Sequence, residues 1–367
     1  MSTILILANN DVGLYKFRKE LIQELIRNGN KIYISLPFGS FVKPLIEMGC
    51  VFIDTPIDRR GMNPLKDIKL LFKYIVMIKK LRPSMVITYT VKPNIYGGIA
   101  SRLMRTKYVV NITGLGSAFQ KDALVRKIIV NLYRLSCKRA KVVFFENEDN
   151  QRLFIENNIV HKNQTFKLNG AGVNLEEYKA CEYPKDTEEI RFLFIGRIMK
   201  EKGIDELLEV AKDVKQKYRK VVFDLVGPME ENYDEVINEF VRKGIIHYHG
   251  FQQNVKPYIR QAHCFVLPSY HEGMANTLLE CAAMGRPLIT SNIHGCKEAI
   301  IDGKTGYLVK VRDKTDLMRQ IIRFIELPYE EKVQMGLQSR KWVEINFDKK
   351  IIVNKTIEKI NCTKFES

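Results

Sequence analysis

The 367-residue sequence lacks the patterns that mark several specialised classes of protein. Its seven cysteines are odd in number and contain no C-x-x-C pair, which predicts reduced thiols and argues against a disulfide framework. No apolar run approaches the ~20 residues needed to span a bilayer, and the apolar start of the chain lacks the basic flank of a signal peptide. No tract rich in proline, serine or glutamine predicts a disordered arm.

Metal-binding patterns are also missing. The sequence contains no D-x-D, and its six histidines show no H-E-x-x-H spacing. We therefore expect chemistry without a cofactor and without an essential metal ion.

Acidic residues are fewer than basic ones. The 59 Lys and Arg residues exceed the 42 Asp and Glu residues, which gives a formal net charge of +17. Such an excess favours an anionic partner, which could be nucleic acid, a lipid headgroup or a phosphorylated metabolite, and charge alone does not choose among them.

Strand-like and helix-like segments alternate twice along the chain. The apolar runs "ILILA", "KIYISL", "MVITYT" and "YVVNIT" are each followed by an amphipathic stretch, and "KVVFFEN" comes next. A fresh alternation starts with "RFLFIG", "VVFDLVG", "IHYHG", "CFVLPS" and "PLITSN". This order predicts an α/β protein with two doubly wound, Rossmann-like sheets and a central cleft at their carboxyl ends. We expect domains at residues 1–175 and 176–345, a linker within residues 170–190, and a C-terminal helical segment at residues 346–367 that packs on the first domain.

The second domain opens with a basic loop in "RFLFIGRIMKEKGIDELL". The predicted strand ends at Gly196, the loop carries Arg197, Lys200 and Lys202, and a helix follows. Cations before the free amide groups of a helix N-terminus form a site suited to a diphosphate. The alternative is a solvated basic loop.

Two glutamates eight residues apart lie in "HEGMANTLLE". Glu272 is expected in a loop at the carboxyl edge of the sheet and Glu280 in the early helix below it, with Asn276 or Thr277 as the helix cap. A carboxylate in a phosphate-binding cleft can accept hydrogen bonds from a ribose diol. Alternatively, both acids satisfy loop amides and nearby cations.

These two segments together resemble the donor half of family-4 retaining glycosyltransferases, which have the two-domain GT-B fold. The resemblance is closest to the branch that builds bacterial capsule, exopolysaccharide and O-antigen units, and it is strongest from about Phe192 to Val309. It implies that Arg197 and Lys202 grip the donor diphosphate, that Glu280 binds the ribose hydroxyls, and that Glu272 lies beside the donor sugar. It also implies that Gly13 lies in a loop after the first strand, in "NNDVGLY", that approaches the donor phosphates, and that the backbone amides of Gly273, Met274 and Ala275 bind sugar hydroxyls or phosphate. The further donor-binding positions are Gly196, Asn276 and Thr277.

The first domain departs from the family pattern at Thr113, where many members have a histidine that contacts the donor sugar. The following glycines, Gly114 and Gly116, still suit a loop that comes close to substrate. The resemblance thus implies an acceptor-side or sugar-facing loop whose sugar preference is left open.

As an enzyme of this family, the chain is expected to move an N-acetylhexosamine or hexose, with retention, from a nucleotide sugar, by default UDP-linked, to a polyprenyl-diphosphate-linked saccharide. It would act in the bacterial cytoplasm, peripherally on the inner face of the cytoplasmic membrane, and would bind no nucleic acid. A sugar-nucleotide epimerase or hydrolase of the same fold, and a non-enzymatic nucleic-acid-binding protein, are the alternatives. A nicotinamide dehydrogenase is disfavoured because no G-x-G-x-x-G follows the first strand.

Residues 63–83 and 121–141 combine apolar side chains with clustered Lys and Arg. Helices of this composition bind anionic membrane surfaces. The alternative is that their apolar residues are ordinary core against the first sheet.

Overall fold

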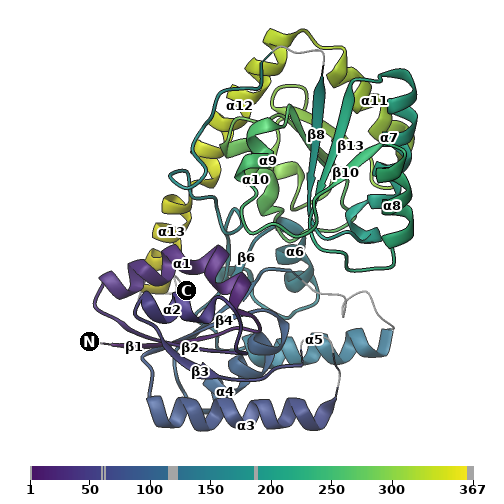
Figure 1. Ribbon diagram of the computed structural model, residues 1–367. Coiled ribbons are helices and arrows are strands. Elements are labelled where there is room, and N and C mark those ends of the chain that lie inside the picture. The colour runs from purple at the N-terminus through teal and green to yellow at the C-terminus, as the bar shows by residue number, and fades with distance from the viewer. Residues whose placement is uncertain (1, 59–60, 62, 115–122, 186–188, 362–367) are drawn as a thin grey trace. The chain divides into compact units, whose positions relative to one another are not determined.

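The computed structural model describes residues 2–58, 61, 63–114, 123–185 and 189–361 (Figure 1). The chain forms two compact units, each described by itself below. Unit 1 runs from the N-terminus to Ala171 and includes the segment that starts at Lys349, whereas unit 2 is Gly172–Asp348. The divisions lie a few residues from those expected at 175 and 345.

A parallel sheet forms the centre of unit 1. Its strands are β1 (Thr3–Leu7), β2 (Lys31–Leu36), β3 (Val51–Asp54), β4 (Met85–Tyr89), β5 (Tyr108–Ile112), β6 (Val142–Phe145) and β7 (Thr165–Lys167). Within the described residues their order is β3-β2-β1-β4-β5-β6-β7. The apolar runs predicted as strands form β1, β2, β4, β5 and β6, and the sequence analysis missed the two edge strands.

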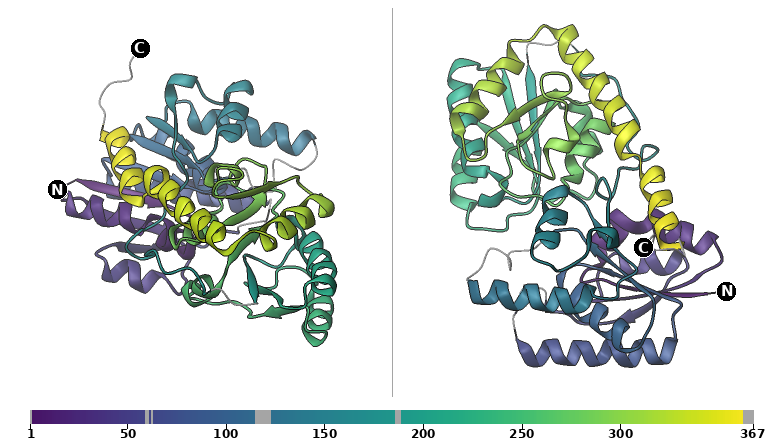
Figure 2. Two further views of the ribbon diagram at one scale, coloured as in Figure 1. Left: turned by 90° about the horizontal axis from the view of Figure 1, so that it is seen from above. Right: turned by 180° about the vertical axis from the view of Figure 1, so that it is seen from behind.

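Helices cover both faces of this sheet (Figure 2). They are α1 (Asp11–Arg27), α2 (Val42–Glu47), α3 (Pro64–Leu81), α4 (Gly98–Leu103), α5 (Ala123–Cys137), α6 (Glu148–Glu156) and α13 (Lys349–Asn361), with the turns η1 (Pro93–Gly97) and η3 (Lys162–Gln164). Buried side chains of α3, α4 and α5 share one core cluster, and those of α1, α2 and α13 share the cluster on the opposite face.

Helix α1 begins earlier than its sequence suggested. The Asn/Asp/Gly segment expected as a loop is the first helical turn, because the Asn10 side chain accepts a hydrogen bond of 2.6 Å from the Gly13 amide and caps the helix. Asp11 is the first helical residue and lies buried. The placement of Gly13 in a loop was therefore wrong.

The C-terminal helix α13 completes unit 1. Its side chains Ile352, Val353 and Ile360 are buried in the same cluster as the apolar face of α1. The Lys349 Nζ, at the start of α13, lies 3.8 Å from the Glu20 Oε2 on α1. The last helix in the sequence therefore supplies core to the first sheet.

Unit 2 is a second parallel sheet with helices on both faces (Figure 1). Its strands are β8 (Ile190–Ile195), β9 (Val221–Val226), β10 (Ile246–Tyr248), β11 (Cys264–Leu267), β12 (Leu288–Ser291) and β13 (Gly306–Val309). Its helices and turns are α7 (Ile204–Lys217), α8 (Asp234–Arg242), α9 (Lys256–Gln261), α10 (Asn276–Ala283), α11 (Lys314–Ile325), α12 (Tyr329–Phe347), η4 (Lys200–Lys202) and η5 (Lys297–Ala299). Strand β13 is the one strand of this unit that the sequence analysis missed.

The strand order in the described part of unit 2 is β10-β9-β8-β11-β12-β13. Because β8 lies between β9 and β11 and all pairs are parallel, the loops that follow these three strands leave the same edge of the sheet. These loops hold the basic segment and the first of the two glutamates. Topology alone thus brings the two sequence motifs to one place.

Candidate functional site

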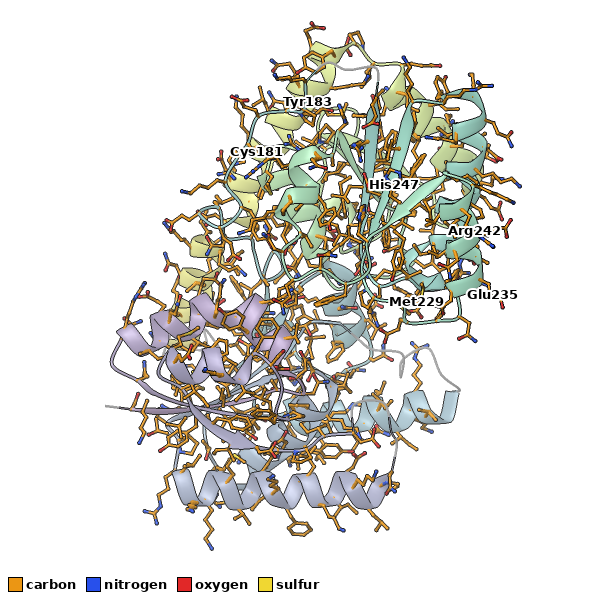
Figure 3. The ribbon with its side chains drawn as sticks, in the orientation of Figure 1. Cys181, Tyr183, Met229, Glu235, Arg242 and His247 are labelled. Atoms are coloured by element: carbon orange, nitrogen blue, oxygen red, sulfur yellow. The ribbon has the colours of Figure 1, made fainter. Side chains whose placement is uncertain are left out.

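The loop after β8 starts at a close approach between two backbones. The Gly196 amide donates to the Val226 carbonyl over 3.0 Å. Gly227, which follows β9, has φ +148°, and a Cβ there would lie 1.8 Å from the Gly196 oxygen, so only glycine fits. Further along, Ile198 pairs in a short parallel bridge with Met229, which Figure 3 labels. The start of the loop is therefore fixed by main-chain contacts.

The end of the same loop packs against the loop after β11. Gly203 has φ +70°, and a Cβ at this position would lie 2.2 Å from the Pro268 carbonyl oxygen. The Tyr270 amide donates to the Glu201 carbonyl over 2.8 Å. These contacts join the segment that carries Lys202 to the segment that carries Glu272.

Lys202 and Glu272 form an ion pair in this interior corner. The Lys202 Nζ lies 2.5 Å from the Glu272 Oε1, and the side chains are 15% and 12% exposed. The Ser269 hydroxyl donates to the same carboxylate oxygen over 2.8 Å. A charged donor and a charged acceptor at this distance make a strong hydrogen bond. The structure therefore brings together two residues that the sequence assigned to separate parts of the donor.

Arg197 lies at the start of the same loop and is much more exposed. Its side chain is 46% exposed, and its Nη1 lies 3.7 Å from the Glu230 Oε1. At this distance and exposure the contact is a loose surface ion pair of small energy. The guanidinium is thus available to a diphosphate, since exchange of partners costs little.

Helix α7 follows Gly203, but its first turn already carries two acids. Asp205 accepts a hydrogen bond of 2.7 Å from the Tyr233 hydroxyl, and Glu206 accepts from the Tyr270 hydroxyl at 2.7 and 2.8 Å. Burial, followed by the nearby Glu206 carboxylate, raises the pKa of Tyr270. These carboxylates complement the positive end of the helix and oppose a bound phosphate there.

The N-terminus of α10 has fewer competing groups than that of α7. The N-cap of α10 is Ala275, which provides no side-chain hydrogen bond, and its first turn contains no acid. The expectation that Asn276 or Thr277 caps the helix was wrong: Asn276 is the first helical residue, and its Oδ1 is buried without a hydrogen-bond partner. A helix end without a side-chain cap and with a buried acceptor suits a ligand with both phosphate and hydroxyl groups.

One amide assigned to the donor is used by the protein. The Ala275 amide donates to the Gly295 carbonyl over 2.8 Å, so it is not available to a sugar or phosphate. Gly295 was missed by the sequence analysis. It has φ +89°, and a Cβ there would lie 2.6 Å from the Glu272 carbonyl oxygen. The backbone of Glu272 and Gly273 is thus positioned by a glycine that lies after β12.

Glu280 lies in the second turn of α10, beside Tyr178. Burial raises the pKa of Tyr178, and the Glu280 carboxylate, which also accepts a hydrogen bond from the tyrosine, raises it further. Tyr178 was also missed, because the segment between the two sheets contained no motif. Met274 and Ala275 are buried, whereas Thr277 is half-buried.

The residues predicted in unit 1 lie near the ends of its own elements. Thr113 and Gly114 follow β5 directly, and Gly114 has φ +157°. Gly116 lies outside the described residues. Gly13 lies in the first turn of α1, where its amide is bound by Asn10. Among the described residues, no group of three or more His, Cys, Asp or Glu side chains is arranged to hold a metal ion.

Comparison with known proteins assigns the chain to a family. Residues 176–342 match the family model described as glycosyl transferases group 1, and residues 3–147 match the model described as glycosyl transferase 4-like. The chain is a GT-B glycosyltransferase. The two models each match most of one unit, and the donor-side motifs of this glycosyltransferase lie within residues 176–342.

Two curated relatives and one solved structure illustrate the similarity. The chain is 27% identical, over 96% of both chains, to the Campylobacter jejuni N,N'-diacetylbacillosaminyl-diphospho-undecaprenol alpha-1,3-N-acetylgalactosaminyltransferase. It is 27% identical, over 72% of both chains, to the Escherichia coli UDP-Gal:alpha-D-GlcNAc-diphosphoundecaprenol alpha-1,3-galactosyltransferase. Anabaena HepE, solved in complex with UDP and glucose, superposes with a TM-score of 0.80 and 16% identity over 98% of this chain and 99% of its own. The sequence-based family and fold are thereby confirmed.

Proposed function

We propose that this glycosyltransferase moves a sugar from a UDP-sugar to a polyprenyl-diphosphate-linked saccharide, with retention of configuration at the anomeric carbon. The transferred sugar would be an N-acetylhexosamine or a hexose. The product would be a lipid-linked intermediate of a bacterial surface polysaccharide. The Campylobacter and Escherichia relatives both have names that include an undecaprenyl-diphosphate acceptor, which supports the choice of acceptor class.

The arrangement at the edge of the second sheet carries the proposal. Arg197 and Lys202 lie on one loop, and Lys202 is positioned by Glu272. The neighbouring N-terminus of α10 offers amides without a side-chain cap. A diphosphate needs two or more cations and several amide donors, and a sugar needs acceptors such as the Asn276 Oδ1 and Glu280. Both requirements are met by adjacent loops of one sheet.

The chemical step follows from these charges. The bond between the anomeric carbon and the β-phosphate oxygen breaks, and the acceptor hydroxyl oxygen forms the new bond on the same face of the sugar. The acceptor proton passes to an oxygen of the departing diphosphate. Arg197 and Lys202 would stabilise the charge that builds up on this leaving group, so we expect transfer without an added metal ion.

The acceptor class also suggests where the enzyme works. A polyprenyl diphosphate is held in a membrane by its lipid chain, so the enzyme must reach the membrane surface. We propose that it lies peripherally on the cytoplasmic face of the bacterial inner membrane. Within the described ranges, no helix is both long and apolar enough to cross a membrane.

Nucleotide binding provides the first test of the proposal. Titration calorimetry with UDP, GDP and dTDP, in the absence of metal, would compare the wild type with Lys202→Ala. We expect UDP to bind and the variant to lose at least about tenfold in affinity, because a cation to the diphosphate is removed. Lys212→Ala, an exposed lysine on α7, is the matched control and should bind as the wild type does.

The Lys202→Ala variant leaves the carboxylate of Glu272 without its cation, which can destabilise the fold. The double variant Lys202→Ala with Glu272→Gln removes this buried charge and separates binding from folding. A folded double variant that still binds UDP like the wild type would contradict the proposed role of Lys202. Release of UDP from a UDP-sugar without any acceptor would favour a hydrolase.

A further inference from the structure

Helix α3 of unit 1 exposes a stripe of large apolar side chains. Leu65, Ile68, Phe72 and Val76 are 70%, 50%, 62% and 63% exposed. Their spacing of three, four and four residues places all four on one side of the helix. Scattered exposed apolar residues are normal, but an ordered row of four along one helix is not. We call these four residues the α3 stripe.

The α3 stripe is separate from the core face of the same helix. Leu70, Tyr74, Met77 and Ile78 are buried against the first sheet, together with α4 and α5. Because a helix repeats every 3.6 residues, these positions lie on the side opposite the stripe. The sequence allowed two interpretations of the apolar residues in this helix, packing against the sheet or contact with a membrane. Helix α3 has a separate face suited to each.

Cations flank the α3 stripe. Lys66, Lys69, Lys73, Lys79 and Lys80 are all exposed on α3. Two of them also contact the protein: the Lys66 Nζ lies 3.6 Å from the Asp58 Oδ2, and the Lys73 Nζ donates to the Asp54 carbonyl over 2.7 Å. The one acid of the helix, Asp67, is bound elsewhere: its carboxylate oxygens contact the Lys92 Nζ at 2.7 Å and the Tyr96 hydroxyl at 3.0 Å. The exposed side of α3 is therefore apolar along its centre and positively charged beside it.

The same side of the sheet carries further groups of this kind. Helix α5 exposes Ile128 and Leu135, which are 59% and 44% exposed, and it contains no acid between residues 123 and 137. At the end of α4, Leu103 is 61% exposed. Helices α3, α4 and α5 pack on one face of the sheet (Figure 2). This face thus extends the basic and apolar character of α3.

We propose that the α3 stripe inserts into the headgroup region of an anionic membrane, with the flanking lysines bound to lipid phosphates. An apolar stripe bordered by lysines is the pattern of interfacial helices. A second copy of the chain would bring the same lysines face to face, and like charges oppose such a pairing. An anionic membrane offers an apolar interior to the stripe and phosphate groups to the lysines. The net charge of +17 also favours binding to an anionic surface.

This inference deepens the proposed function and rests on it, because the lipid-linked acceptor is the reason that the enzyme must reach a membrane. Membrane binding itself is measured without sugar transfer. The two proposals can therefore fail independently, and UDP binding reports on the donor site alone.

Vesicle flotation tests the inference with the full chain. Vesicles of phosphatidylcholine with phosphatidylglycerol, and of phosphatidylcholine alone, would be mixed with the wild type and with Ile68→Ser/Phe72→Ser at low salt. We expect the wild type to float with the anionic vesicles, and the double variant to bind at least about tenfold more weakly, since two large apolar side chains are lost. The matched control is Leu337→Ser/Ile345→Ser, which removes two exposed apolar side chains from α12 in unit 2 and should float like the wild type.

The electrostatic part has its own variants. Replacing Lys69 and Lys80 by glutamine should weaken binding to anionic vesicles by about fivefold for each lysine, and added salt should reduce wild-type binding. Undiminished flotation of Ile68→Ser/Phe72→Ser, or no flotation of the wild type, would overturn the proposal. So would a wild-type dimer that the stripe variant abolishes without any change in vesicle binding. Unchanged hydrogen exchange in peptides of β1 to β6 would show that unit 1 of the stripe variant is folded.

Discussion

Arg197 is held more loosely by the protein than Lys202, the other cation assigned to the diphosphate. Its exposed guanidinium has one loose contact, to Glu230, whereas Lys202 is enclosed beside Glu272. At the scale of single residues, we expect Arg197 to act on the ligand alone, whereas Lys202 also contributes to the stability of the fold.

We therefore predict that Arg197→Ala lowers turnover by roughly 10²- to 10³-fold, the usual cost of losing one contact to a leaving group. The unfolding temperature should stay the same, because a half-exposed arginine with a loose ion pair adds little stability. Turnover would be measured with a UDP-sugar and a lipid-linked acceptor, and unfolding by calorimetry. Arg242→Ala, an exposed arginine at the end of α8 (Figure 3), is the control. Full activity in a folded Arg197→Ala would contradict the assignment.

His263 makes unit 2 sensitive to acid. Burial, helped by the nearby Lys332 and Arg286, lowers its pKa from 6.5 to about 4. Because the pKa of the folded state is below that of the unfolded state, stability is complete above about pH 6.5 and is lost as the pH falls toward 4. The expected loss from pH 7 to pH 5 is roughly 2 kcal/mol.

Urea unfolding at pH 7 and pH 5 would measure this loss. The single tryptophan, Trp342, lies in unit 2 and donates to the Glu298 carbonyl, so its fluorescence follows that unit. His263→Asn should remove most of the extra loss at pH 5. The exposed His271→Asn should keep this extra loss. An equal drop in the free energy of unfolding between pH 7 and pH 5 in the wild type and both variants would show that another group is responsible.

The position of the candidate site residues in the fold could be predicted from sequence where a residue type in a fixed spacing carried the interpretation. Arg197, Lys202 and Glu272 were expected at one sheet edge and Glu280 in the helix below it, and the structure places them there, whereas their roles stay predictions. Tyr178 and Gly295 could not be found in this way, since each reaches the site through contacts between segments far apart in sequence. The Ala275 amide was misassigned for the same reason, because its partner carbonyl belongs to a distant loop.

At the scale of elements, the start of α7 depends on a glycine that no other residue can replace. We predict that Gly203→Ala lowers the free energy of unfolding of unit 2 by roughly 3 kcal/mol or more. Part of this is the cost of a left-handed backbone, and the rest is the overlap of Cβ with the Pro268 carbonyl.

Gly244 provides the matched control for that prediction. It also has a positive φ, +63°, but a Cβ added there would meet no atom within 4 Å. Gly244→Ala should therefore cost only about 1 to 2 kcal/mol. Both variants would be followed by Trp342 fluorescence in urea. An equal loss of unfolding free energy in the two variants would mean that the backbone near Pro268 moves to accommodate the added Cβ at little cost.

Apolar runs predicted the central strands and missed three strands at sheet edges, β3, β7 and β13. Strands β3 and β7 contain no buried residue, so neither presents the continuous apolar run of a buried strand. The first turn of α1 was missed because Asn10, Asp11 and Gly13 favour turns in isolation. Here the Asn10 cap and the burial of Asp11 decide the conformation.

At the scale of the whole molecule, the two units differ in how they are assembled from the sequence. Unit 2 is continuous, whereas unit 1 takes its last helix from the end of the chain. The expected C-terminal segment at residues 346–367, packed on the first domain, lies close to the observed start of this part of unit 1 at Lys349, although α12 and α13 follow each other with one residue between them. Helix α13 belongs to unit 1 because its apolar side chains are buried in the hydrophobic core of that unit.

We predict that Ile352→Ala/Ile360→Ala destabilises unit 1 selectively. Each substitution removes a buried side chain from the cluster shared with α1, at about 2 to 5 kcal/mol per site. Hydrogen exchange with mass spectrometry should show faster exchange in peptides of β1 to β6 and unchanged exchange in β8 to β13. The control is Asn354→Ala/Lys355→Ala, which changes two exposed residues of the same helix. Equal acceleration in both units would show that they unfold together.

The position of α13 also has a consequence for the newly made chain. A ribosome releases the first sheet early, but α13, which covers part of one of its faces, is translated only after unit 2. Until then, the apolar surface around Ile22 and Leu25 lacks its α13 partners, while unit 2 already has every segment it needs. We therefore expect the second half of this protein to reach its native fold first, and the first half to depend on chaperones or on the speed of translation.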